Sequence, residues 1–241
     1  MTMALTATLA CGLSAAGAFS VSPVRLVFEP RDRAVALTLT NDGDSEVALQ
    51  ADLYRWQQDG HGVDQLTLTD DLIVAPPSLK MAPRSRQVVR VALVGPRDPT
   101  RQATYRLMVR EIPEATATAA SAVQLPIALV LSLPVFITPV GAQNALQCQS
   151  LAPPVTPKLA PGDMVVRCIN QGQAHAQVRR LEIRQFGQLR ATLQGGAYLL
   201  AGVQRDFVLR AEPGSASSVP SQDHLELQVW LDDGKTQSFQ W

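Results

Sequence analysis

Short runs of alternating apolar and polar residues follow one another along the first half of the chain. They cover residues 21–28, 34–40, 47–54, 87–94 and 105–112. Because the side chains of a β-strand point alternately to its two faces, this period of two predicts strands. Turn residues separate the runs, as in Asn41-Asp42-Gly43-Asp44 and Asp59-Gly60-His61-Gly62. This spacing is typical of a β-sandwich.

The longest extended apolar run covers residues 123–137 and is followed by Pro139. A second series of predicted strands then begins, at 164–169, 177–184, 189–193, 205–209 and 225–231, with glycine-containing turns such as Gly195-Gly196 between them. We therefore expect an all-β protein with two immunoglobulin-like β-sandwich domains, residues 19–138 and 139–241.

The first residues predict export from the cytoplasm. The stretch from Met3 to Ala16 is apolar and small, and Ala16-Gly17-Ala18 supplies a small-x-small cleavage pattern before Phe19. We interpret residues 1–18 as a signal peptide, although no Lys or Arg precedes the apolar stretch; an ordinary N-terminus is the alternative. No later apolar run reaches about 20 residues, so we expect no membrane insertion.

Composition, charge and the lack of known motifs make several classes of function unexpected for this chain. The 21 Lys and Arg residues balance the 21 Asp and Glu residues, so no net charge attracts nucleic acid. The three histidines, His61, His175 and His224, are far apart and lack neighbouring ligands, so we expect no metal site. No Gly-x-Ser-x-Gly, HExxH or phosphate-binding glycine loop occurs, and we expect neither enzymatic activity nor a cofactor.

The cysteines fit an oxidising compartment. Cys11 lies within the predicted signal peptide, which leaves Cys148 and Cys168 in the mature chain. An even pair in an exported protein predicts a disulfide bond. Two buried thiols are the alternative.

Several segments resemble one known family in their order along the chain. They are Ser22-Pro23-Val24-Arg25-Leu26-Val27-Phe28, Pro76-Pro77, Pro83 leading to Val89-Arg90, Tyr105-Arg106-Leu107-Met108-Val109-Arg110-Glu111-Ile112-Pro113, and Leu133-Pro134-Val135-Phe136. Together they resemble the periplasmic pilus-assembly chaperones of the chaperone-usher pathway, over nearly all of the first predicted domain. In the second, the stretches 170–175 and 198–202 resemble the archaic branch of that family.

The resemblance implies a boomerang of two immunoglobulin-like domains that works in the periplasm. Its partners would be pilin subunits, bound in the cleft, and an outer-membrane usher. Such a chaperone lends its partner a β-strand, and an alternating apolar row fits that role. The row is Val123, Leu125, Ile127, Leu129 and Leu131, which share one face of an extended strand. The alternative is that these side chains fill the first domain's own core.

The resemblance also implies a cationic anchor for the C-terminal carboxylate of a pilin. Arg25, predicted to lie mid-strand in residues 21–28, matches the family's N-terminal anchor arginine, and a guanidinium can bind a carboxylate through two parallel bonds. Pro134 stands where the family has its second anchor, a lysine, and Thr138 where it has an interdomain ion-pair residue. Arg106 is the candidate substitute for that lysine. The alternatives are a rim arginine for Arg25 and a solvated strand residue for Arg106.

A different class of function also fits two immunoglobulin-like domains. A secreted adhesion or carbohydrate-binding module would share the fold, because function resides in sites that a fold carries. The two interpretations differ in whether a pilin subunit co-purifies with the chain and unfolds when it is stripped away.

Overall fold

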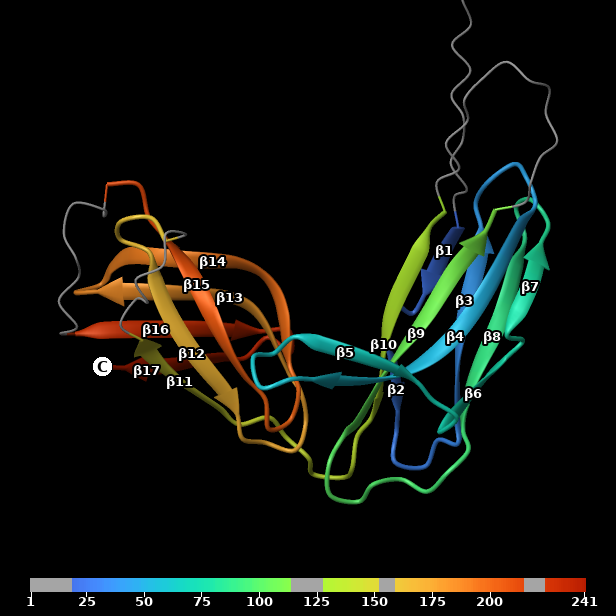
Figure 1. The fold of residues 1–241 in the computed structure, drawn as a ribbon, viewed down its shortest axis with the longest axis horizontal. Helices are drawn as coiled ribbons and strands as arrows, with labels where there is room; N and C mark the ends of the chain where they lie inside the picture. The colour runs from blue at the N-terminus through green and yellow to red at the C-terminus, as the bar shows by residue number, and fades with distance from the viewer. Residues whose placement is uncertain (1–18, 114–127, 152–158, 215–223) are drawn as a thin grey trace, which may run out of the picture.

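The computed structural model describes residues 19–113, 128–151, 159–214 and 224–241. Every regular element within these ranges is a β-strand. Figure 1 shows two β-sandwich domains that form the arms of a V. The predicted all-β, two-domain immunoglobulin-like fold is confirmed.

Ten strands of the first domain lie within the described residues. They are β1 (Phe19–Ser22), β2 (Leu26–Phe28), β3 (Ala34–Asn41), β4 (Val47–Gln58), β5 (Asp64–Leu68), β6 (Leu72–Ala75), β7 (Ser78–Met81), β8 (Arg86–Leu93), β9 (Ala103–Ile112) and β10 (Val130–Ile137). One sheet has the order β1-β3-β8-β6 and the other β2-β10-β9-β4-β5, with β7 pairing with β4. Leu39 and Val91 from the first sheet pack on Leu107 and Val135 from the second. Burying such side chains contributes about 1.5 to 3 kcal/mol each.

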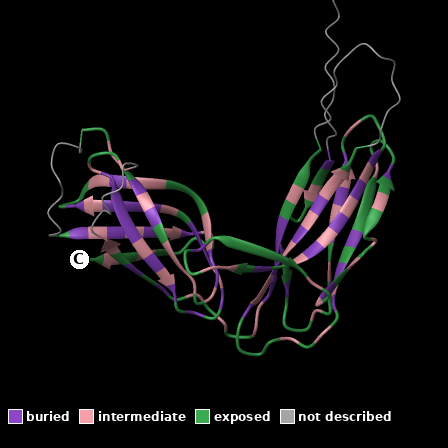
Figure 2. Ribbon diagram, in the orientation of Figure 1, coloured by how far each residue is buried: buried purple, intermediate pink, exposed green. Residues whose placement is uncertain are grey.

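The second domain contains the remaining strands. They are β11 (Leu146–Leu151), β12 (Met164–Asn170), β13 (Ala176–Gln185), β14 (Gln188–Leu199), β15 (Gln204–Ala211), β16 (Leu225–Leu231) and β17 (Thr236–Gln240). They hydrogen-bond in the order β11-β12-β15-β14-β13-β16-β17. Figure 2 shows buried residues alternating with more exposed ones along them. The second core is separate from the first.

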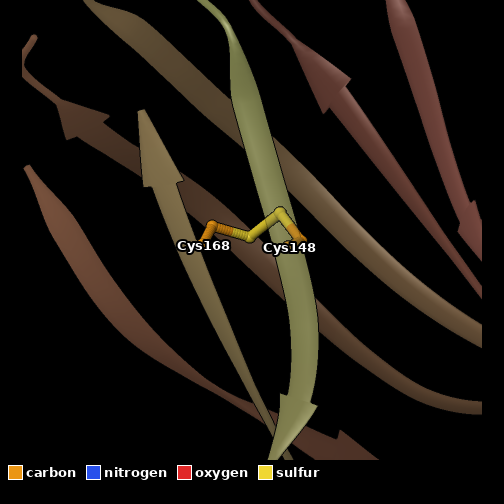
Figure 3. The surroundings of a disulfide bond; sticks show 2 residues. All are labelled: Cys148 and Cys168. Atoms are coloured by element: carbon orange, nitrogen blue, oxygen red, sulfur yellow. A yellow bond between two sulfur atoms is a disulfide. The ribbon is translucent and has the colours of Figure 1, made fainter. Parts of the chain in front are cut away.

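The predicted disulfide bond is present in this second core. Cys148 of β11 and Cys168 of β12 lie directly opposite each other in the antiparallel pair, and their sulfur atoms are 2.01 Å apart (Figure 3). Both cysteines belong to the buried cluster. The bond therefore ties the edge strand β11 to its neighbour inside the domain.

The prediction of one strand over residues 21–28 is wrong. β1 pairs antiparallel with β3 in one sheet, whereas β2 pairs parallel with β10 in the other. Pro23, preceded by a cis peptide bond, falls between them, and a proline has no N–H to continue a ladder. The chain thus crosses between the sheets here. Arg25 lies in the bend that precedes β2 and not in the middle of a strand.

The predicted turn at Gly195-Gly196 is also wrong, because β14 continues through both glycines. The pairs Val178–Ala197 and Arg180–Gln194 leave one residue of β13 opposite two of β14. Gly195 has a φ of +132°, which side chains other than hydrogen rarely permit. The glycines therefore mark a β-bulge within the sheet.

The hairpin of β4 and β5 extends toward the second domain (Figure 1). Its tip is the predicted turn at residues 59–62, where the Asp59 carboxylate accepts bonds from the backbone N–H groups of His61 and Val63. Arg205 of β15 donates to the carbonyl of Gly62 at 3.4 Å. The hairpin thereby forms one side of the domain junction.

Candidate functional site

An aromatic cluster joins the two domains. Trp56 of β4 and Phe136 of β10, both 1% exposed, pack with Leu200, which follows β14. Tyr198 of β14 meets the ring of Trp56 edge-on, with 5.0 Å between centroids, and His175, just before β13, stacks on Phe136 at 3.8 Å. Rings in such arrangements add attraction beyond their buried area. The junction is therefore a packed contact.

Side-chain amides hold the same junction through directional bonds. The Gln58 amide donates to the carbonyl of Tyr198 (3.0 Å) and accepts from the N–H of Leu200 (2.9 Å). Gln102 Oε1 accepts from both the backbone N–H and the Nδ1 of His175, at 2.9 and 2.8 Å. Nδ1 therefore carries a proton. These bonds restrict how the backbone at Tyr198, Leu200 and His175 of the second domain can be oriented relative to the first domain.

Arg25 bridges the domains from the bend between β1 and β2. Its Nη1 donates to Oδ2 of Asp232 at 2.7 Å, and its Nη2 donates to Oε1 of Gln177 at 2.6 Å. Burial lowers the pKa of Arg25, but the hydrogen bond and charge of Asp232, with a contribution from Tyr198, outweigh it and leave the pKa raised. The side chain is 35% exposed. Arg25 is thus a cation at the junction that already has an anionic partner.

Arg106 of β9 lies close by, on the face of the sheet that meets the second domain. Its guanidinium carbon is 3.7 Å from the ring centroid of Trp56 and 5.4 Å from that of Tyr198. The nearest carboxylate, that of Asp64, is 3.8 Å away. Burial lowers the pKa of Arg106, while the charge of Asp64 acts in the opposite direction. With a side chain only 14% exposed, Arg106 is a cation held over an aromatic ring and not a solvated strand residue.

Tyr198 brings the two predicted anchor arginines into one site. Its hydrogen bond with Arg25 contributes to the raised pKa of that guanidinium, and its ring also lies beside Arg106. Arg106 is directly opposite Pro134 of β10 in the β9–β10 ladder. Cross-strand partners share a face and place their Cβ atoms about 5 Å apart. The side chain of Arg106 therefore leaves the sheet next to Pro134, the position where the resemblance implies a lysine.

The predicted donor strand lies only partly within the described ranges. Val123, Leu125 and Ile127 are outside them. Leu129 is 37% exposed and precedes β10, and Leu131 packs partly on the first core. β10 pairs with β9 along its length, but with β2 only from Val135 to Ile137.

The first half of β10 therefore has one neighbouring strand among the described residues. Its other edge, over residues 130–134, presents backbone groups in the way that edge strands do. Pro134 supplies no N–H there, so the donors on this edge come from the residues before it.

Metal and membrane sites are not found in the part of the chain that the structure describes. No group of His, Cys, Asp and Glu there could hold a metal ion, and no helix there is long and apolar enough to cross a bilayer. A cavity of about 520 Å³ opens at the junction, with Trp56, Gln102, Tyr105 and Leu200 in its wall.

Sequence reasoning missed Gln177 and Asp232, which hold Arg25, and Gln58 and Tyr198 beside them. Asp232 starts a turn whose sequence, Asp-Asp-Gly, indicates nothing more than a turn. It is 207 residues from Arg25. No local pattern could have connected the two.

Comparisons with known proteins agree on one kind of protein. Residues 18–143, more than half of the chain, match the family model described as "Pili and flagellar-assembly chaperone, PapD N-terminal domain". No curated protein matches the chain.

Solved structures share the fold at low sequence identity. One is the CsuC–CsuE chaperone–tip adhesion subunit pre-assembly complex from archaic chaperone-usher Csu pili of Acinetobacter baumannii (19% identity, TM-score 0.65, covering 93% of this chain and 98% of that one). Another is the E. coli chaperone DraB (14%, 0.58, 93% and 96%). A third is the Salmonella enterica SafA pilin in complex with the SafB chaperone (12%, 0.58, 93% and 96%).

Proposed function

Because this chain belongs to the family of pili and flagellar-assembly chaperones, we propose that it is a periplasmic chaperone of pilin subunits. It binds a pilin in the cleft, completes the pilin's fold with its own donor strand and delivers it to an outer-membrane usher. The observation that carries this proposal is the edge of β10 that has no partner strand among the described residues, next to a site with two arginines.

The parts of the chain have distinct roles in this proposal. Residues 1–18 direct export, residues 19–138 form the domain that carries the donor strand, and residues 139–241 form the second wall of the cleft. Similarity to the fold of an archaic Csu chaperone complex supports a place in the archaic branch. The function is binding and needs no cofactor.

The donor strand acts through main-chain bonds and apolar side chains. An added partner strand along residues 130–134 would continue the sheet, which is how β-augmentation gains affinity. The apolar row of Val123, Leu125, Ile127, Leu129 and Leu131 would enter the pilin groove. Five such side chains contribute on the order of 10 kcal/mol before ordering and association costs are subtracted.

Arg25 and Arg106 bind the pilin's C-terminal carboxylate in this proposal. Arg25 has five N–H donors, so its bonds to Asp232, Gln177 and Tyr198 leave donors for a partner's carboxylate. Arg106 is the cross-strand partner of Pro134, and its guanidinium lies over the ring of Trp56. It therefore replaces the cation that the family places on the donor strand. Two cations around one carboxylate fix both its position and the register of the strand that ends in it.

A peptide-binding experiment tests the carboxylate site. The probe is a labelled peptide with the sequence of the C-terminal strand of a pilin encoded beside the chaperone, made with a free carboxylate and with a C-terminal amide. We expect the carboxylate form to bind more tightly. We also expect Arg25→Ala to remove about 2 to 5 kcal/mol of its binding free energy, and Arg106→Ala a smaller amount.

The control is Arg84→Ala, since Arg84 is exposed and pairs with Asp44 far from the cleft. It should bind both peptides as the unmodified chaperone does. Equal affinity of the unmodified chaperone for the carboxylate and amide forms would remove Arg25 and Arg106 from the proposed role.

A further inference from the structure

Arg25 already binds a carboxylate that belongs to the chaperone itself. Asp232 lies in the turn after β16, its side chain is 18% exposed, and its Oδ2 is 2.7 Å from Nη1 of Arg25. The backbone N–H of Asp232 donates to the carbonyl of Gln177 at 3.0 Å. These two acceptors of Arg25, Asp232 and Gln177, are thus fixed to each other on the second domain.

Each of the two arginines already lies beside an acidic side chain. Arg25 and Arg106 are positive, and Asp232 and Asp64 are negative. Burial lowers the pKa of His175 to about 4, so this nearby ring is neutral at pH 7. A partner's carboxylate would therefore be the third anion beside two cations.

We propose that Asp232 is a resident carboxylate that attenuates the affinity of the cleft for a partner's C-terminal carboxylate. This inference rests on the proposed function. The incoming carboxylate either binds Arg25 together with Asp232 or replaces Asp232 as the acceptor of the hydrogen bond from Nη1. Gln177, which is uncharged, keeps its bond to Nη2 and acts as a positioning residue. Asp232 thereby lowers the affinity of a site that must later release its pilin.

The sign of the effect follows from electrostatics. Two carboxylates on one guanidinium repel each other, and in a partly buried site this repulsion is screened far less than in water. If Asp232 served only to orient Arg25, its removal would weaken binding of the carboxylate. If Asp232 attenuates the affinity, its removal strengthens binding of the carboxylate.

The bond between Arg25 and Asp232 also crosses the domain junction. Arg25 belongs to the first domain, whereas Asp232 and Gln177 belong to the second. A partner that draws Arg25 from Asp232 weakens one of the contacts between the domains. Loading of the cleft is thereby coupled to how tightly the two domains are held together.

The test compares Asp232→Asn with Asp233→Asn in the full chaperone, using the same carboxylate and amide peptides. Asp233 is the exposed neighbour, paired with Lys235 at 3.0 Å, so its replacement changes the net charge equally at a distance from Arg25. We expect Asp232→Asn to bind the carboxylate peptide about tenfold more tightly, with the amide peptide unchanged. Asp233→Asn should change neither affinity.

Gln177→Ala provides a second measurement. Because Gln177 orients Arg25 without repelling the ligand, its loss should weaken binding of the carboxylate peptide several-fold and leave the amide peptide unchanged. Asp232→Ser, which also removes the charge, replaces Asp232→Asn if circular dichroism shows that the asparagine variant is not folded.

The outcomes separate this inference from the proposed function. If the unmodified chaperone prefers the carboxylate peptide but Asp232→Asn binds it equally or more weakly, attenuation is wrong and the anchor stands. If neither protein distinguishes the two peptides, both ideas are wrong. A preference for the carboxylate peptide that is larger in Asp232→Asn than in the unmodified chaperone supports attenuation.

Discussion

His175 is a buried titratable group at the domain junction. Desolvation by burial is the largest influence on it and lowers its pKa to about 4, from 6.5 when exposed. Between these values the unfolded chain binds a proton that the folded protein does not, so stability falls as the pH decreases from about 6.5 to 4. The expected decrease in the free energy of unfolding is about 3 kcal/mol. Chemical denaturation at a series of pH values measures it.

His175→Gln should remove most of this pH dependence, because glutamine does not titrate. His61→Gln is the matched control, since His61 is exposed at the tip of the β4–β5 hairpin. Equal slopes for the unmodified protein and His175→Gln between pH 6.5 and 4 would contradict the assignment. The carboxyl groups with lowered pKa values, such as that of Asp163, affect stability only at lower pH.

At this scale the sequence predicted two anchor arginines, whose role stays a prediction, but not their environment. Arg25 and Arg106 stood out by position in motifs, which are local features. Their partners Asp232, Gln177 and Trp56 come from other strands or from the other domain. Which side chains meet there depends on register and on the angle between domains, and neither is encoded in a short segment.

At the scale of elements, the strands of seven or more residues were predicted, whereas shorter ones such as β6 and β11, which also have buried residues, were not. In β3, β4, β8 and β9 the apolar residues alternate with polar ones or occur in short runs, because one face of each strand packs on the core. β5 is exposed at every residue and β7 has four residues, so neither produces a pattern. The division of residues 21–28 into β1 and β2 reflects Pro23 and a change of sheet, which alternation alone does not reveal.

The entry to β10 offers a prediction about the donor strand. Leu129 is 37% exposed and Val130 49%, and successive residues in an extended segment face opposite sides. Leu129 continues the apolar row that ends at Leu131. We expect Leu129→Glu to weaken binding of a pilin subunit at least about tenfold, because a leucine that gains about 1.5 to 3 kcal/mol on burial becomes a charge. Its melting temperature should stay the same.

Val130→Glu is the control on the opposite face, and it should bind the pilin more nearly as the unmodified chaperone does. Pull-down yield and circular dichroism melting are measured for both variants. A large fall in the melting temperature of Leu129→Glu would place this side chain in the chaperone's own core. Equal binding losses for the two variants would refute the assignment of the faces.

At the scale of the whole molecule, two separate cores are joined by a small, well-bonded junction. The first core and the second share no buried residue, while Trp56, Phe136 and Leu200 form a third cluster between them. Gln58 and Gln102 add bonds across the same contact. The two-domain organisation was predictable from the break near Pro139, but the junction was not, because its members are scattered through the chain.

This arrangement predicts how the domains unfold together. The Cys148–Cys168 bond closes a loop with a sequence separation of 20, and a loop of that length stabilises its domain by about 3 kcal/mol. In the unmodified protein the junction couples the domains, so calorimetry should give one transition that reduction of the disulfide shifts as a whole. Gln58→Ala combined with Tyr198→Ala removes two bonds and an aromatic contact across the junction. This variant should show two transitions, of which reduction lowers only that of the second domain. A single transition in the variant, shifted as a whole by reduction, would show that the domains are coupled by something other than these contacts.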